Sequence, residues 1–199
     1  MAGKNVSPAP PRPVSTASQL RNLRTRLGLS QHELATWLGL SRAQLAQVET
    51  GRDPLPRHAE RWLRALAEVG AAPPAVALVP LPGVPATGPP LVVARLAECR
   101  YQAQRLHQQL VAQQGRVAVL RARLALGPPL QAMLAPADAA EAAHAPTALR
   151  RRWLARLLEA ATDNLEPATQ AATLLAARCH AWQSEADWLV ATLTVGPVA

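Results

Sequence analysis

Apolar residues between positions 31 and 51 fall into two short helical stripes with a glycine between them. The stripes consist of Leu34, Ala35 and Leu38, and of Leu45 and Val48. Spacings of three and four residues place such side chains on one face of a helix. Each stripe therefore predicts a short helix with one buried face.

Capping residues indicate where both helices begin and end. Ser30 followed three residues later by Glu33 is a capping box, so the first helix begins directly after the serine. Gly39 can adopt the left-handed conformation that ends a helix. Ser41 is the expected N-cap of the second helix and Gly51 its expected stop.

Two short helices with a glycine turn, and a small Ala35 where they cross, are typical of the helix-turn-helix. An αα-hairpin inside another kind of helical protein is the alternative interpretation. The same stretch resembles the Cro and phage-repressor (XRE-type) family of helix-turn-helix domains over about residues 17 to 70. The resemblance rests on L-R-x-L-R (from Leu20), L-S-Q-x-E-L-A-x-x-L-G (from Leu29) and S-R-x-x-L-x-x-V-E-x-G-R (from Ser41).

This resemblance implies a set of DNA-contacting residues. Gln31 would contact a phosphate, Thr50 and Arg52 would lie by the DNA backbone, and the start of the second helix would face base edges. An ion pair between Arg24 and Glu49 is also implied, with a structural role. The full DNA-binding set is Gln31, Ser41, Arg42, Ala43, Gln44, Gln47, Thr50 and Arg52.

The chemistry of these side chains agrees with that assignment. Arginine can make a bidentate contact to guanine, and glutamine to adenine, each contributing roughly 1 to 3 kcal/mol of discrimination. The amide end of a helix at Gln31 is a natural seat for phosphate. A solvated polar face is the alternative interpretation of the same residues.

Helical stripes on both sides complete a four-helix domain, expected over residues 15–70. Leu20, Leu23 and Leu27 predict a first helix, and the residues from Ala59 to Val69 predict a fourth. Trp37 lies off the stripe of its own helix and is expected to point toward solvent. Residues 1–14 are expected to be a disordered, proline-rich arm, and residues 71–90, with seven prolines and no charge, a linker.

Beyond the linker the apolar positions repeat as a heptad, which predicts one helix of about 35 residues, roughly 50 Å long. The flanking positions carry arginines and no acid, so a parallel homodimer along this seam is unfavourable. The seam is expected to pack against other helices or to run antiparallel. The seam residues are Val92, Leu96, Cys99, Ala103, Leu106, Leu110, Gln113, Val117, Leu120 and Leu124.

Residues 91–199 are expected to form an antiparallel helical bundle, giving an all-α protein. Residues 91–127 carry net charge +5 and residues 137–199 net charge −2, which suits mutual packing. One helix is expected over about 147–165, and a last one opened by Pro167. The side chains expected to face inward on the last helix are Leu174, Leu175, Cys179, Trp182, Leu189 and Leu193.

Composition and charge favour a DNA-binding protein and argue against a secreted or membrane protein. The formal net charge of +8 suits duplex DNA, a dense polyanion. The two cysteines lie in helical patterns and are expected to stay reduced in a cytoplasmic protein. Arginines or prolines interrupt every apolar run before about 18 residues, and the first residues lack the apolar segment of a secretory signal, so no membrane association is expected.

The sequence gives little evidence for a metal site, a catalytic site or another binding site besides the DNA-contacting residues. Asp138, Glu141 and His144 could share a helix face, but they lack a further ligand at matching spacing, so no metal and no cofactor are expected. The chain shows none of the common catalytic motifs, and we expect no enzyme. The arginines at 150–152 and at 156 are interpreted as a solvated helix face, with phosphate or partner binding as the alternative.

The sequence therefore predicts a sequence-specific DNA-binding transcriptional regulator, as a homo-oligomer on double-stranded DNA. Two copies held by the long C-terminal helix would present recognition helices about 34 Å apart. The alternative is an antitoxin-like or phage-derived interaction module whose C-terminal domain, residues 91–199, binds a partner protein.

Overall fold

The computed structural model describes residues 16–69, 88–135 and 145–195. The described residues are helical throughout, with short turns and no strand, which confirms the all-α class. The expected arm at 1–14 and nearly all of the expected linker at 71–90 lie outside the described residues.

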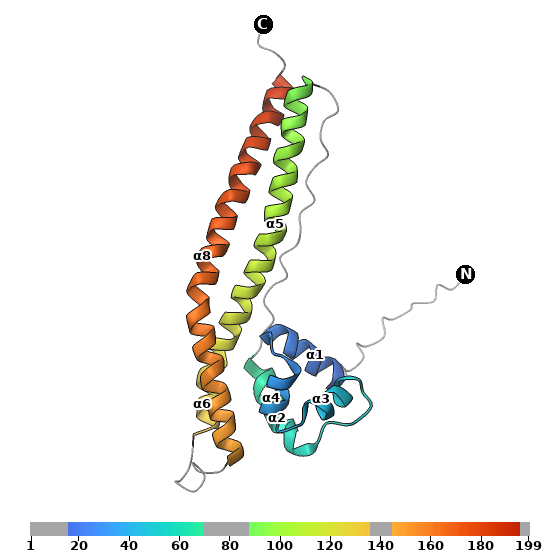
Figure 1. Cartoon of the computed structure of the whole chain (residues 1–199), viewed down its shortest axis with the longest axis vertical. Coiled ribbons are helices and arrows are strands. Elements are labelled where there is room, and N and C mark those ends of the chain that lie inside the picture. Colours follow the sequence, from blue (N-terminus) through green and yellow to red (C-terminus); the bar gives the residue numbers. More distant parts are fainter. Residues whose placement is uncertain (1–15, 70–87, 136–144, 196–199) are drawn as a thin grey trace, which may run out of the picture.

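Four helices form an N-terminal unit: α1 (Thr16–Leu27), α2 (Gln31–Leu38), α3 (Arg42–Glu49) and α4 (Arg57–Val69). The remaining helices form a long hairpin: α5 (Pro90–Ala125), the short α6 (Gly127–Met133) and α8 (Ala145–Val195). Figure 1 shows α5 and α8 side by side along the hairpin, with the N-terminal unit against the end where α6 lies.

The heptad seam of α5 faces α8 of the same chain. Leu96, Cys99 and Ala103 are buried at one end of the hairpin, and Val117 and Leu120 at the other. The helices run antiparallel, because residues near the start of α5 pair with residues near the end of α8. The expectation that this seam packs against another helix in antiparallel fashion is therefore correct.

Polar contacts set the register of the hairpin. Arg95 donates to both carboxylate oxygens of Glu185, at 2.7 and 2.9 Å. Further down, the side-chain amide of Gln113 donates to the carbonyl of Ala168 at 3.1 Å. Cys99 and Cys179 are free and buried within the hairpin, as expected of reduced core thiols.

The expected break before Pro167 is wrong, because α8 runs through this residue without interruption. Proline removes one backbone hydrogen bond and strains the preceding turn, at a cost of about 3 kcal/mol. Pro167 is exposed, so its ring points to solvent, while Ala161 and Ala168 are buried against α5 on either side. Packing along α5 thus favours one continuous helix over two shorter ones.

The last helix faces α5 with the expected residues, except for Leu174. Leu174 was expected inside but is 63% exposed. Cys179, Ala186 and Leu189 are buried, so the inward stripe passes through Leu175 rather than its neighbour. Adjacent residues on a helix point about 100° apart, so Leu174 points away from α5 when Leu175 is turned toward it.

One hydrophobic cluster joins the N-terminal unit to the base of the hairpin. It contains Leu34, Leu38 and Trp62 from the unit, together with Leu130 and Leu157 from the hairpin. The two parts therefore share a core instead of folding around separate ones.

Trp37 lies at the centre of this shared core, so the expectation that it points to solvent is wrong. Its side chain has no exposed surface. Its ring meets Trp62 edge-on at 5.4 Å between centroids and lies 5.0 Å from Trp153 of α8. The indole N–H donates to the carbonyl of Trp62 at 3.0 Å. The residue lies off the stripe of Leu34, Ala35 and Leu38 because it faces α4 and the hairpin, through Trp62 and Trp153.

Candidate nucleic-acid interface

The start and end of α2 have the geometry that its sequence predicts. The Ser30 hydroxyl accepts from the backbone N–H of Glu33 at 3.2 Å, and the Glu33 carboxylate accepts from the Ser30 N–H at 2.7 Å. Gly39 ends the helix with φ 73° and ψ 34°. The left-handed conformation at Gly39 turns the chain directly into the N-cap of α3.

A second capping box, which the sequence interpretation missed, begins α3. The Ser41 hydroxyl accepts from the backbone N–H of Gln44 at 3.1 Å. The side-chain oxygen of Gln44 accepts in return from the Ser41 N–H at 2.9 Å. The pattern S-x-x-Q carries this signal, since glutamine can replace glutamate at the third helical position. Gln44 thus has a structural role besides any contact with DNA.

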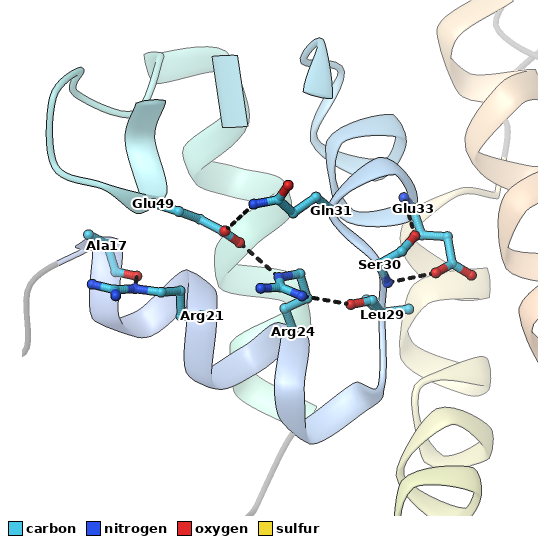
Figure 2. A network of polar contacts seen from close by, with 8 residues as sticks. All are labelled: Ala17, Arg21, Arg24, Leu29, Ser30, Gln31, Glu33 and Glu49. Carbon is cyan, nitrogen blue, oxygen red and sulfur yellow. Dashed lines mark hydrogen bonds and ion pairs between the residues drawn. The ribbon is translucent and has the colours of Figure 1, made fainter. Parts of the chain in front are cut away.

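Glu49 ties α1, α2 and α3 together (Figure 2). One carboxylate oxygen accepts from Arg24 Nε at 3.0 Å, and the other accepts from the side-chain amide of Gln31 at 2.8 Å. Arg24 also donates to the carbonyl of Leu29 at 3.5 Å. Glu49 is almost fully buried, so both of its oxygens need these donors. The expected Arg24–Glu49 ion pair is present, and it fixes the orientation of α3.

The outer face of α3 is solvent-exposed. Arg42, Ala43, Gln44 and Gln47 are exposed, whereas Leu45 lies in the core with Val48 and Glu49. Figure 1 shows α3 on the side of the N-terminal unit away from the hairpin. The hairpin therefore leaves the face with the arginine and glutamines exposed to solvent.

Residues after α3 flank this face. Thr50 is exposed and donates its hydroxyl hydrogen to the carbonyls of Ala46 and Gln47, at 3.1 and 2.9 Å. Gly51 has φ 75°, as expected of the stop, and the exposed Arg52 follows. Ser41 is exposed at the other end of the helix. The structure thus brings Ser41, Arg42, Ala43, Gln44, Gln47, Thr50 and Arg52 onto one exposed helix and its ends.

Comparison with family models gives one match, described as a helix-turn-helix domain, over residues 17–78. Within this match, the described residues 17–69 form a helix-turn-helix domain. The match agrees with the resemblance to the XRE-type class and covers the exposed helix α3. Searches of curated proteins and of solved structures find no match.

The hairpin holds the helix-turn-helix domain by capping two of its helices with arginines. Arg150 of α8 donates from Nε to the carbonyl of Trp37, the penultimate residue of α2, at 2.8 Å. Arg123 of α5 donates to the carbonyls of Leu27 and Gly28, at the end of α1, both at 2.7 Å. Cations suit the carboxyl ends of helices, where carbonyls lack helical partners.

Arg150 was expected on a solvated face, and that expectation is wrong. Its guanidinium lies 4.0 Å from the centroid of the Trp62 ring, and the residue is buried. Burial, and secondarily the positive charge of Arg61, lower the pKa of Arg150 below its usual range. Arg151 donates to the carbonyl of Leu134, after α6, at 2.7 and 2.9 Å. Arg152 and Arg156 are exposed, as expected.

The weak metal candidate at Asp138, Glu141 and His144 lies outside the described residues. Within the part of the chain that the structure describes, no three histidine, cysteine or acidic side chains are grouped so that they could hold a metal ion. The same part contains no helix with the length and apolar character needed to cross a membrane.

Proposed function

We propose that this protein is a sequence-specific, DNA-binding regulator of transcription that inserts α3 into the major groove of double-stranded DNA. The observation that carries the proposal is the exposure of Arg42 and Gln47 on a helix whose opposite face, with Leu45 and Val48, lies in the core. Such a helix offers hydrogen-bonding side chains to base edges without exposing its apolar residues.

The contacts of the exposed side chains on α3 separate residues that would read bases from a residue that stabilises the helix. Arg42 and Gln47 are exposed and serve direct base readout. Gln44 already accepts a bond from the Ser41 N–H through its oxygen, and a bidentate contact to adenine needs both its oxygen and its nitrogen. Gln44 therefore acts mainly in holding the start of α3, and contributes at most its amide hydrogens to DNA.

Residues around α3 would contact the DNA backbone. The Gln31 amide has two hydrogens, and Glu49 accepts one of them, so one hydrogen is left for a phosphate next to the amide end of α2. Arg52 and Thr50 would lie by the backbone at the other end of α3. Contacts of this kind set the position of the protein on the duplex and make binding salt-dependent.

Two further properties belong to the same proposal. We place the protein in the cytoplasm, where its DNA target would lie, and we expect it to act as a homo-oligomer on paired half-sites. The heptad seam of α5 is filled by α8 of the same chain, so it is not available to a second copy. Any association through the hairpin must use another of its faces.

Selection of bound sequences from a random pool of duplexes, repeated at two salt concentrations, tests the proposal. A base-reading protein yields a consensus at both salts. Arg42→Ala and Gln47→Ala should each weaken binding to that consensus by about 5- to 150-fold, from roughly 1 to 3 kcal/mol per bidentate contact. Arg105→Ala, an equal change of charge on the exposed surface of α5, is the control and should leave the preference intact.

The alternative function, a protein-interaction module acting through the hairpin, predicts another outcome. Capture of a partner would then require residues of the hairpin and would be indifferent to Arg42→Ala and Gln47→Ala. Absence of any consensus at either salt concentration would contradict the DNA-reading proposal.

A further inference from the structure

The distal half of α8 carries a second, outward stripe that no described residue covers. Leu174 and Trp188 are 63% and 66% exposed. They lie fourteen residues apart, with Ala181 midway, so all three share one face of the helix. The residues three positions after each are also exposed: Ala177, Ser184 and Ala191.

This outward stripe is heptad-spaced and lies opposite the face that packs on α5. The inward face of the same stretch carries Cys179, Ala186 and Leu189. Figure 1 shows this part of α8 beyond the helix-turn-helix domain, near the free end of the hairpin. A helix with two apolar faces, of which one is filled by α5, is suited to a second helix.

We propose that a second copy of this chain covers the outward stripe, with its α8 antiparallel to the first. The dimer itself does not depend on the proposed function. Only its consequence for DNA binding rests on that function. In the register that sets Ala181 against Ser184 of the second copy, Trp188 meets Ala177 and Leu174 meets Ala191. Each large side chain thus faces a small one, as packing of knobs into holes requires.

Charges on both edges of the stripe fit the same register. In an antiparallel pair each edge of one helix faces the same edge of its partner. One edge carries Arg178 and Glu185, and the other carries His180 and Asp187. One edge thus sets Arg178 against the opposite charge of Glu185, the other lets the His180 imidazole donate a hydrogen bond to Asp187, and the two-fold axis repeats both pairs.

Glu185 can serve both copies. It accepts from Arg95 of its own chain through both oxygens, yet the Glu185 side chain keeps 38% of its surface exposed. An ionised carboxylate has about four acceptor sites, so a further donor from Arg178 of the second copy can bind. Charge and size complementarity therefore identify the same partner and the same orientation.

This arrangement has a consequence for DNA. The axis lies between positions 181 and 184, about 32 residues from Arg150, where α8 holds the helix-turn-helix domain. At 1.5 Å per residue that is about 50 Å, so the two domains lie about 100 Å apart. This spacing is about three times the 34 Å expected for adjacent half-sites, and it fits sites about three helical turns apart or two separate duplexes.

Cysteine cross-linking of the full-length chain tests the orientation. A mixture of the Ala181→Cys and Ser184→Cys variants should form a disulfide-linked dimer under mild oxidation, whereas Ala181→Cys alone should not. The native cysteines are buried, and the chain without added cysteines gives the background level of cross-linking. Efficient cross-linking of Ala181→Cys with itself would indicate parallel helices, and no cross-link in any sample would indicate no such dimer. Either result overturns the proposal.

Charge exchange tests the same pairing without cysteines. His180→Glu places two carboxylates together and should weaken the dimer in analytical ultracentrifugation. Adding Asp187→Arg should restore it. In a parallel dimer position 180 would face Glu185 instead, so the second change would not restore association. Failure to restore would therefore contradict the antiparallel register.

The third experiment removes the apolar contact of Trp188 and measures the affinity of the dimer. Trp188→Glu should raise the dissociation constant of the dimer about tenfold or more, whereas Leu149→Glu, an exposed leucine near the start of α8, should not. Trp188→Glu should still bind a single selected half-site, while Arg42→Ala with Gln47→Ala should abolish that binding without changing dimerisation. These two results separate failure of the dimer from failure of the proposed function.

Discussion

Arg150 Nε donates to the carbonyl oxygen of Trp37 at 2.8 Å, although 113 positions separate the two residues in the chain. The same guanidinium stacks over Trp62, so one side chain of α8 contacts α2 and α4 together. The helix-turn-helix domain and the hairpin are thereby joined through a helix cap inside a shared apolar core. Movement of the hairpin base would expose both a helix end and the tryptophans.

Arg150→Ala should destabilise the protein by about 2 to 3 kcal/mol, because it removes a charge-assisted hydrogen bond and a desolvated cation–π contact. Arg150→Lys should recover only part of this loss, since an ammonium lacks the planar fork that bonds and stacks at once. Urea unfolding measures both. Arg152→Ala, on the exposed face of the same helix, is the control and should be nearly neutral. Equal effects of the changes at 150 and 152 would contradict the buried cap.

Two glycine-to-alanine changes should have opposite signs. Gly39 has φ 73°, and an added Cβ would lie 3.0 Å from Arg150 Nη2, so Gly39→Ala should cost about 1 to 2 kcal/mol. Gly115 is exposed within α5, with nothing within 4 Å of an added Cβ. Gly115→Ala should stabilise by up to about 1 kcal/mol. Thermal unfolding of the two variants checks the contrast, and a stabilising Gly39→Ala would refute the left-handed turn.

Substitutions at Gln44 should separate stability from DNA affinity. Gln44→Glu keeps a capping-box acceptor at the third helical position, so the unfolding free energy should change little. It also brings a negative charge toward phosphates, so affinity for the selected site should fall and the fall should shrink at high salt. Gln44→Ala loses the cap and should cost about 0.5 to 1 kcal/mol. Unchanged affinity in Gln44→Glu would place this residue away from DNA.

The two buried thiols predict a dependence of stability on pH. Burial is the main cause that raises the pKa of Cys99 and of Cys179 above the ordinary value, and the carboxylate of Glu185 adds to it at Cys99. The unfolded chain therefore loses these protons first as the pH rises. Their contribution to stability is full below about pH 8 and falls above about pH 9. Urea unfolding at several pH values, compared with Cys99→Ala and Cys179→Ala, measures the change; an unaltered slope in both variants would contradict it.

Local signals in the sequence predicted the helix-turn-helix domain well. Ser30, Glu33 and Gly39 act on neighbouring backbone groups, so their roles can be seen within a few residues. The position of Trp37 depends on Trp153, more than a hundred residues away, and no local pattern carries that information. The position of Arg150 was mispredicted for the same reason. Its charge suggested exposure to solvent, but its partners are the carbonyl of Trp37 and the ring of Trp62, both far away in the sequence.

Pro167 provides a test of the largest error in that prediction. If α8 is continuous there, Pro167→Ala restores a backbone N–H to the helix and removes a steric clash, so it should stabilise the protein by about 1 to 3 kcal/mol. If a helix began at this residue instead, proline would be favourable in its first turn, and the same change would be neutral or destabilising. The two structures thus predict different signs for one substitution. Urea unfolding decides between them, with Glu159→Ala, an exposed change nearby on α8, as the control for a general gain in helix propensity.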